Sequence, residues 1–279
     1  MKFGLLIIGD EILSGKRADK HLPKVIELLA ARGLALSWAR YVGDDPERIT
    51  ADLEDAFSEV AAHGDVVFSC GGIGATPDDH TRQCAARALR VPLSLHPQAR
   101  ALIIERMRDV AAEQGVAFEP EREDNLHRLN MGVFPQAAQI IPNPYNKIAG
   151  FSCHPAGEVT HAERGGVFFV PGFPVMAWPM IEWVLDRHFP YVHQIDAQRE
   201  KSVIVFGSME ATLTPLMEAI EQRFAGVKVF SLPSVDHEQW GRHIELGVKG
   251  APARVEPAYL ALLAGLAEHK VTLGPELVR

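Results

Sequence analysis

Apolar and polar residues follow a strand–helix–strand order along the first ninety residues. A continuous apolar run at Phe3–Ile8 predicts a buried strand, and residues 19–32 repeat their apolar positions at helical spacing. Further strands are expected at 34–42 and 65–70, each followed by a polar turn and a helix. Repeated units of this kind indicate an α/β fold with three layers, in which helices cover both faces of a mostly parallel sheet.

The next hundred residues are less regular. The pattern predicts a helix at 97–114, a charged loop at 119–124, short strands at 140–145 and 150–153, a hairpin tip at 154–165, a buried strand at 167–170 and a helix that ends near 188.

The composition changes near residues 191–200, where we place a domain boundary. The first domain is expected to span 1–190 and the second 198–279. In the second, the pattern predicts a strand at 202–206, a helix at 211–224, strands at 227–232 and 243–248, and a final helix at 257–269. The order β-α-β-β-α is that of a small α+β module.

Composition excludes several classes of partner. With 28 basic and 36 acidic residues, the net charge of −8 argues against a nucleic-acid partner, but a local site can still bind a small anion. No apolar stretch approaches a membrane span, and the first apolar run ends too early for a signal peptide. Three cysteines without CxxC spacing are typical of reduced thiols, so we expect a cytoplasmic protein with no membrane partner.

Acidic residues follow the ends of the first three predicted strands. These are Asp10 and Glu11, then Asp44 and Asp45, and then Asp78 and Asp79, which close a glycine-rich loop. Parallel strands bring their carboxyl ends to one edge of the sheet, so the six carboxylates should crowd together. A divalent metal would relieve the repulsion, and the expected metal ligands are Asp10, Glu11, Asp44, Asp78 and Asp79.

The glycines point to an anionic ligand at the same edge. Gly71, Gly72 and Gly74 remove side chains where a strand turns into a helix, so that backbone amides can face a phosphate. Gly172 follows another buried strand, and Asn143 and Asn146 lie in a turn that could reach this edge. The residues expected to bind ligand or phosphate are Gly9, Ser14, Gly71, Gly72, Gly74, Thr76, Asn143 and Gly172.

Simpler structural roles compete with some of these assignments. Asp79 is the fourth residue of a capping-box pattern that begins at Thr76, and Asp45 followed by Pro46 fits a helix N-cap. Asp10 and Glu11 also fit a solvated turn, whereas Asp44 has no capping role. No P-loop, GxSxG elbow or complete dinucleotide fingerprint is found, which disfavours those chemistries.

Several motifs occur in the order of a known family: Gly9–Gly15, Val42–Asp45, Gly71–Asp79, Pro142–Pro144 with Gly150–Phe151, and Val170–Pro174. Residues 1–190 resemble the molybdopterin-binding (MoaB/Mog-like) domain in the version at the N-terminus of competence/damage-inducible protein A (CinA). Residues 198–279 resemble the small module that follows it there. Two departures are a Gly-Ile-Gly-Ala loop, where many relatives have Gly-Leu-Gly-Pro, and the end at residue 279, which leads us to expect no deamidase domain or activity.

The resemblance implies a phosphorylated nucleotide- or pterin-type ligand, and three hypotheses follow. The first is a pyrophosphohydrolase that acts on ADP-ribose or a similar dinucleotide with Mg, Mn or Co, with Asp44 and Asp79 as catalytic residues. The second is a non-catalytic nucleotide- or pterin-binding module, and the third is a molybdopterin adenylyltransferase. The family also suggests a homo-oligomer.

Overall fold

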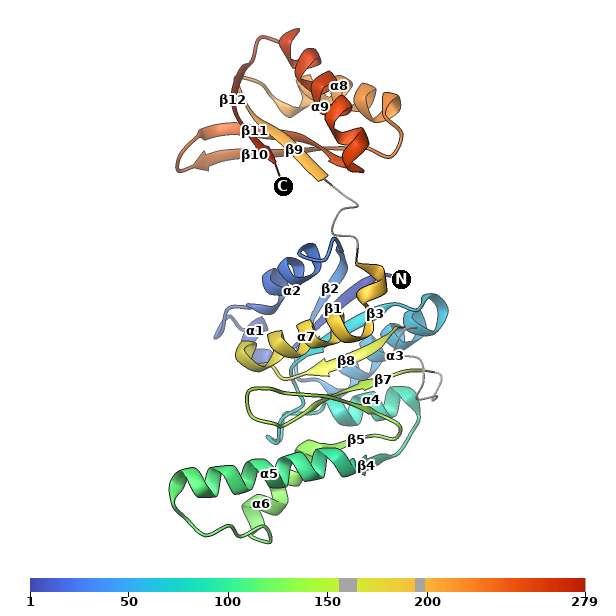
Figure 1. Ribbon diagram of the computed structural model, residues 1–279, viewed down its shortest axis with the longest axis vertical. Coiled ribbons are helices and arrows are strands. Elements are labelled where there is room, and N and C mark those ends of the chain that lie inside the picture. The colour runs from blue at the N-terminus through green and yellow to red at the C-terminus, as the bar shows by residue number, and fades with distance from the viewer. Residues whose placement is uncertain (156–164, 194–198, 279) are drawn as a thin grey trace. The chain divides into compact units, whose positions relative to one another are not determined.

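A six-stranded sheet forms the centre of the first of two compact units, Met1–His193 and Gln194–Arg279 (Figure 1). The computed structural model describes residues 1–155, 165–193 and 199–278. The strand order is β2-β1-β3-β8-β7-β6, in which the first four strands are parallel, β7 pairs antiparallel with β8, and β6 pairs antiparallel with β7. Their bounds are Phe3–Ile8 for β1, Leu36–Val42 for β2, Val66–Cys70 for β3, Gln139–Ile141 for β6, Gly150–Cys153 for β7 and Gly166–Val170 for β8.

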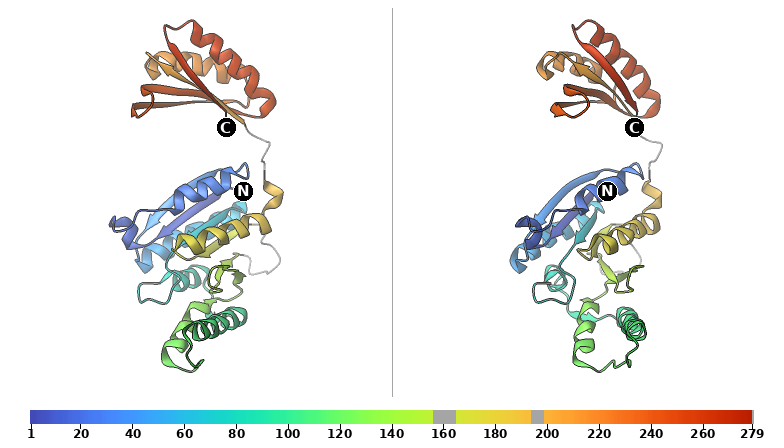
Figure 2. Two further views of the ribbon diagram at one scale, coloured as in Figure 1. Left: turned by 60° about the vertical axis from the view of Figure 1, so that its left-hand side comes forward. Right: turned by 90° about the vertical axis from the view of Figure 1, so that its left-hand side faces the viewer.

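Helices cover both faces of this sheet, so the predicted three-layer α/β fold is confirmed (Figure 2). Helices α2 (His21–Ala30) and α7 (Pro174–His188) pack on one face, and α3 (Pro46–His63) and α4 (Thr81–Leu89) on the other. Strand β1 shows why: Leu5 and Ile7 join the core under α2 and α7, while Leu6 and Ile8 join the opposite core. Alternate side chains of a strand point to opposite faces, so a strand buried on both sides is apolar throughout.

The segment between α4 and β6 forms a small subdomain, green in Figure 1. It holds α5 (Pro97–Gln114), at the bounds predicted, and a two-stranded sheet of β4 (Leu93–Leu95) and β5 (Val133–Pro135), which the sequence did not reveal. Helix α6 (Glu123–Arg128) and the 3-10 helix η1 (Leu129–Gly132) join them. The loop expected at 119–124 therefore ends at Glu123, where α6 begins with acidic residues in its first turn.

Two further strand predictions need comment. The strand expected at 140–145 ends at Ile141, because Pro142 and Pro144 cannot donate hydrogen bonds to a neighbouring strand. The hairpin tip expected at 154–165 lies largely outside the described residues. Helix α7 and the short helix η3 (Pro190–Val192) close the first unit, and no helix in the described part of the chain is long and apolar enough to cross a membrane.

The second unit is an antiparallel sheet, in the order β10-β11-β9-β12, covered by two helices. Its elements are β9 (Arg199–Phe206), α8 (Glu210–Arg223), β10 (Lys228–His237), β11 (Gly241–Gly250), α9 (Pro252–Ala267) and β12 (Thr272–Val278). The predicted order β-α-β-β-α thus lacks one element, the final strand β12. Helix α9 also begins five residues before the predicted start, at Pro252, and continues through Pro257.

Candidate ligand-binding site at the carboxyl edge of the sheet

The carboxyl ends of β1, β2, β3 and β8 surround a cavity of about 390 Å³. Its acidic side chains are Glu11, Asp44, Asp78 and Asp79, its glycines are Gly9, Gly71, Gly72, Gly74 and Gly172, and its apolar residues include Ile8, Ile73, Met131, Ile148, Phe173 and Met176. Thr76 and Asn146 also line it, and Arg17 is its single basic residue among those described. The expected meeting of strand ends therefore produces a hollow that is lined by both acidic and apolar side chains.

The glycine loop after β3 takes a backbone path that only glycine follows without strain. Gly71 and Gly72 have φ angles of +108° and +66°, and a Cβ atom on Gly72 would lie 2.1 Å from Oγ1 of Thr81. Within the described residues, the amides of Gly72, Ile73, Gly74 and Ala75 donate no hydrogen bond to the protein. Four consecutive unpaired amides beside a cavity are suited to an anionic ligand.

Asp10 and Asp44 connect the loops after β1 and β2 by a reciprocal pair of hydrogen bonds. The amide of Asp10 donates to Oδ2 of Asp44 at 2.9 Å, and the amide of Asp44 donates to Oδ1 of Asp10 at 3.1 Å. Asp44 lines the cavity, whereas Asp10, an expected metal ligand, does not. Asp10 thus fixes the position of Asp44 relative to β1.

The pKa of Asp44 is raised above the usual range of an aspartate. Partial burial is the main cause, and the negative charges of Asp10, Glu11 and Asp78 add to it, while the hydrogen bond from the Asp10 amide acts in the opposite direction. The carboxylates predicted to share this edge are therefore close enough to repel one another, which is the electrostatic condition that a cation or a bound proton would relieve.

Asp79 closes the glycine loop. Its Oδ2 accepts hydrogen bonds from the amide of Thr76 at 2.8 Å and from Oγ1 of Thr76 at 2.5 Å. Helix α4 begins later, at Thr81, with no side-chain cap at its N-terminus. The helix-cap interpretation of Asp79 is therefore wrong, and this carboxylate, which lines the cavity, stabilises the loop.

Asp45, by contrast, is the N-cap that the sequence predicted for α3. Its Oδ1 accepts from the amides of Glu47 at 2.8 Å and Arg48 at 3.1 Å. It does not line the cavity.

Two predicted ligand-binding residues lie outside the cavity lining. Ser14 follows the short helix α1 (Asp10–Leu13), and its amide bonds to the carbonyl of Asp10. The amide group of Asn143 is used within its own turn, because it donates to Asn146 and Ile148 and accepts from the amide of Tyr145. The neighbouring Asn146, rather than Asn143, borders the cavity.

Arg17 and Phe173 are site residues that the sequence did not reveal. The guanidinium carbon of Arg17 lies 5.8 Å from the centre of the Phe173 ring, and both residues line the cavity. Phe173 is 54% exposed, so its ring is accessible to a ligand in the cavity. Arg17 follows Glu11 by six positions, a spacing typical of no motif. Its place in the site therefore depends on the folded loop alone.

The donor set at the rim fits a hard divalent cation held together with a ligand. Glu11, Asp44, Asp78 and Asp79 offer only oxygen atoms, as Mg²⁺ and Mn²⁺ prefer. Among the described residues, however, these rim carboxylates do not bring three ligand atoms within 4.8 Å of one another. The arrangement therefore suits an ion bound by one or two carboxylates and by phosphate oxygens, rather than one held entirely by protein.

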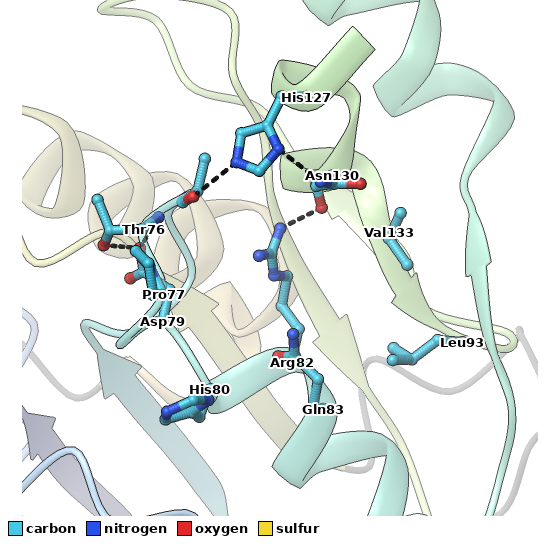
Figure 3. A pocket seen from close by; sticks show the side chains of 11 residues that line it. Thr76, Pro77, Asp79, His80, Arg82, Gln83, Leu93, His127, Asn130 and Val133 are labelled. Atoms are coloured by element: carbon cyan, nitrogen blue, oxygen red, sulfur yellow. Dashed lines mark hydrogen bonds between the residues drawn. The ribbon is translucent and has the colours of Figure 1, made fainter. Parts of the chain in front are cut away.

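A second cavity, of about 450 Å³, adjoins the first across residues 75–79 (Figure 3). Arg82 crosses this region between the glycine loop and η1. Its guanidinium donates to the carbonyl of Asn130 and, at 2.6 Å, to that of Gly74. The side chain is 4% exposed, and burial lowers its pKa. Arg82 thus holds the loop that bears Thr76 and Asp79 against a separate part of the chain.

Together, the three-layer sheet and its glycine-lined, acid-rimmed cavity define an α/β domain that binds a small molecule at the carboxyl ends of its strands. Residues 4–194 match the model of the family described as a probable molybdopterin binding domain, and the chain belongs to this family.

The related proteins support the same assignment. The chain is similar to a CinA-like protein of Anaeromyxobacter dehalogenans, with 34% identity over 188 residues that cover 67% of this chain and 41% of the relative. A CinA-like protein of Syntrophotalea carbinolica is 28% identical over 235 residues, 80% of this chain and 51% of the relative. The chain therefore spans about half the length, or less, of these curated relatives. The resemblance to the CinA type is confirmed.

A solved structure shares the fold. The crystal structure of the protein CinA with unknown function from Thermoplasma acidophilum has a TM-score of 0.51 and 22% identity, and the match covers 67% of this chain and 98% of that chain. At this level of identity the likeness concerns the fold alone.

Proposed function

We propose that the cavity binds a phosphorylated nucleotide- or pterin-type molecule and that the protein hydrolyses a pyrophosphate, such as that of ADP-ribose, with a divalent metal. One observation carries the proposal: four unpaired amides of the glycine loop lie on the same cavity as the perturbed carboxylate of Asp44. Anion-binding groups and a group suited to proton transfer are what cleavage between two phosphates requires.

The glycine loop and Arg17 bind the phosphates in this proposal. The amides of residues 72–75 supply hydrogen bonds without added charge, and the Arg17 guanidinium supplies the positive charge. An overall acidic protein can then bind an anion at this one place.

A divalent ion, Mg²⁺, Mn²⁺ or Co²⁺, would be held by Glu11 and Asp78 beside Asp44 and would supply Lewis-acid stabilisation of phosphate charge. The fit rests on the oxygen-only donor set and on the negative charges of Asp10, Glu11 and Asp78, which add to the effect of burial in raising the pKa of Asp44.

Asp44 orients the attacking water and accepts its proton. A raised pKa makes this carboxylate a stronger base than an ordinary aspartate, and the Asp10 amide fixes its orientation. Asp79 acts through the loop, since its bonds to Thr76 hold the amides in place. The apolar wall of Ile148, Phe173 and Met176 receives the flat ring of the ligand.

A turnover assay tests this function. The full chain is incubated with ADP-ribose and Mg²⁺, Mn²⁺, Co²⁺ or EDTA, and AMP release is followed. We expect metal-dependent release that falls by at least about 100-fold in Asp44→Asn, in keeping with the loss of a general base. Asp45→Asn is the matched control and should keep its activity, because asparagine caps helices as well as aspartate.

Binding assays separate the alternatives. ADP-ribose that binds but is not cleaved with any of the metals would favour the non-catalytic module. Release of pyrophosphate from ATP that depends on a pterin would favour the adenylyltransferase. Full metal-dependent activity in Asp44→Asn would contradict the role given to Asp44.

A further inference from the structure

Three metal-binding side chains converge at the end of the sheet away from the cavity. Glu59 and His63 lie one turn apart on the last turns of α3, and Asp65 follows directly after the cap residue Gly64. Their ligand atoms all lie within 4.8 Å of one another, the only such group in the described part of the chain. Asp65 precedes β3 and Gly71 follows it, six residues later, so this group is roughly 20 Å from the glycine loop at about 3.3 Å per residue.

The backbone geometry explains why these three residues meet. Residues four apart on a helix are neighbours on one face, which brings Glu59 beside His63. Gly64 then takes the left-handed conformation, with φ +68°, ends the helix and turns the chain so that Asp65 returns toward it. The helix C-terminus adds partial negative charge and favours a cation at this position.

Asp65 supplies an independent indication of a missing partner. Its side chain is 1% exposed, and Oδ1 accepts a hydrogen bond from the amide of Lys2 at 2.7 Å. Oδ2 is also buried and has no hydrogen-bond partner within the described residues. A buried carboxylate oxygen without a donor is unfavourable unless a cation or a proton compensates it.

We propose that Glu59, His63 and Asp65 bind a divalent transition-metal ion of the zinc class, separate from any ion in the cavity. Nδ1 of His63 lies 3.2 Å from Oε2 of Glu59, close to the roughly 3.3 Å between neighbouring ligands of a tetrahedral zinc with bonds near 2.0 Å. One imidazole and two carboxylates are ligands that Zn²⁺ accepts, and water completes the four positions.

The ion would be structural. It would join the end of α3 to the start of β3 and, through the Lys2 amide bonded to Asp65, to the residue before β1. Without metal, Glu59 and His63 form an ordinary ion pair on the helix surface when the histidine is protonated. Metal and proton compete for the same nitrogen, so Zn²⁺ should bind more weakly as the pH falls.

Zinc titration by calorimetry tests the proposal on the Asp44→Asn protein, in which one of the four carboxylates that line the cavity is replaced. We expect one Zn²⁺ site whose affinity falls by at least about 100-fold in His63→Ala. Loss of a residue that only supports a metal ligand already costs up to about 100-fold in affinity, and His63 is proposed as a ligand itself. His63 is 56% exposed, so its replacement should leave the fold intact. His127→Ala, the same change at an exposed histidine of α6, is the matched control and should keep the site.

Thermal unfolding gives a second measurement. Zn²⁺ should raise the melting temperature of the Asp44→Asn protein, because an ion that binds only the folded state stabilises that state. It should not raise the melting temperature of the double variant Asp44→Asn, His63→Ala. Asp65→Asn should also lose the Zn²⁺ effect. Equal zinc affinity and stoichiometry with and without His63 would overturn the proposal, and would leave the proposed function of the cavity untouched.

Discussion

At the scale of single residues, Asp44 shows that the site contains carboxylates that repel one another. Its carboxylate is partly buried near Asp10, Glu11 and Asp78, and its pKa is raised. A carboxylate whose pKa is higher in the folded than in the unfolded state favours folding only when protonated, and this contribution is lost as the pH rises through the folded-state pKa. The ionised form at neutral pH therefore lowers stability, as is common at functional sites.

Asp44→Asn should consequently stabilise the protein while it abolishes activity. We expect a rise of about 1–3 °C in the melting temperature at pH 7 and no difference near pH 3, where the carboxyl group is protonated in both states. Asparagine can still accept the hydrogen bond from the Asp10 amide. Asp45→Asn should show no such rise. A lower melting temperature for Asp44→Asn at pH 7 would mean that this carboxylate is stabilised rather than repelled.

The role of Arg82 in holding the glycine loop can be tested separately from catalysis. Arg82→Met removes the donors to Gly74 and Asn130, and lost hydrogen bonds of a charged group cost about 1.5–3 kcal/mol. We expect the Thr76 amide, which is bonded to Asp79, to exchange its hydrogen at least about tenfold faster. Hydrogen-exchange mass spectrometry or NMR measures this. Arg87→Met, on the exposed face of the same helix, should leave the exchange unchanged.

At the scale of elements, the turn from β3 into the glycine loop depends on two conformational conditions, a positive φ and the absence of a side chain. Gly72→Ala violates both, since its Cβ would meet Oγ1 of Thr81. Gly15→Ala violates only the first, because nothing lies within 4 Å of its Cβ. We expect a loss of about 2–4 kcal/mol for Gly72→Ala and about 1 kcal/mol for Gly15→Ala in denaturant unfolding. Equal losses would show that the close packing at Gly72 is unimportant.

The elements also show what a sequence can reveal. Strand β3, the glycine loop and the Asp45 cap have local causes, and all were predictable. Strands β4 and β5 have three residues each and exist only through their pairing. Strand β12 contains Gly274 and Pro275, a pair that is typical of a turn, and it pairs with β9 across a register shift. Its sequence therefore does not predict a strand.

The candidate site divides in the same way. Asp44 and the glycines follow strand ends, where parallel-sheet topology brings ligand-binding residues together. Arg17, Asn146 and Phe173 reach the cavity through loop paths that no periodicity encodes. Asn143 and Asn146 show the limit clearly, because the sequence places both in one turn and only the folded turn decides which of them borders the cavity.

At the scale of the whole molecule, the chain contains two units with separate cores. The core of Gln194–Arg279 is built from residues of that unit alone, on β9, β10, β11, α8 and α9. A fragment of residues 194–279 should therefore fold without the first unit and unfold cooperatively. Circular dichroism during heating measures this, with the fragment 1–193 as its counterpart. A fragment 194–279 without a cooperative transition would contradict the division.

The central claim is that the glycine loop binds the phosphates of a nucleotide- or pterin-type ligand beside Asp44. The most direct measurement is a crystal structure of the Asp44→Asn protein with ADP-ribose and Mn²⁺. The account predicts pyrophosphate oxygens within about 3.2 Å of the amides of residues 72–75. ADP-ribose bound elsewhere, with these amides facing only solvent, would contradict it.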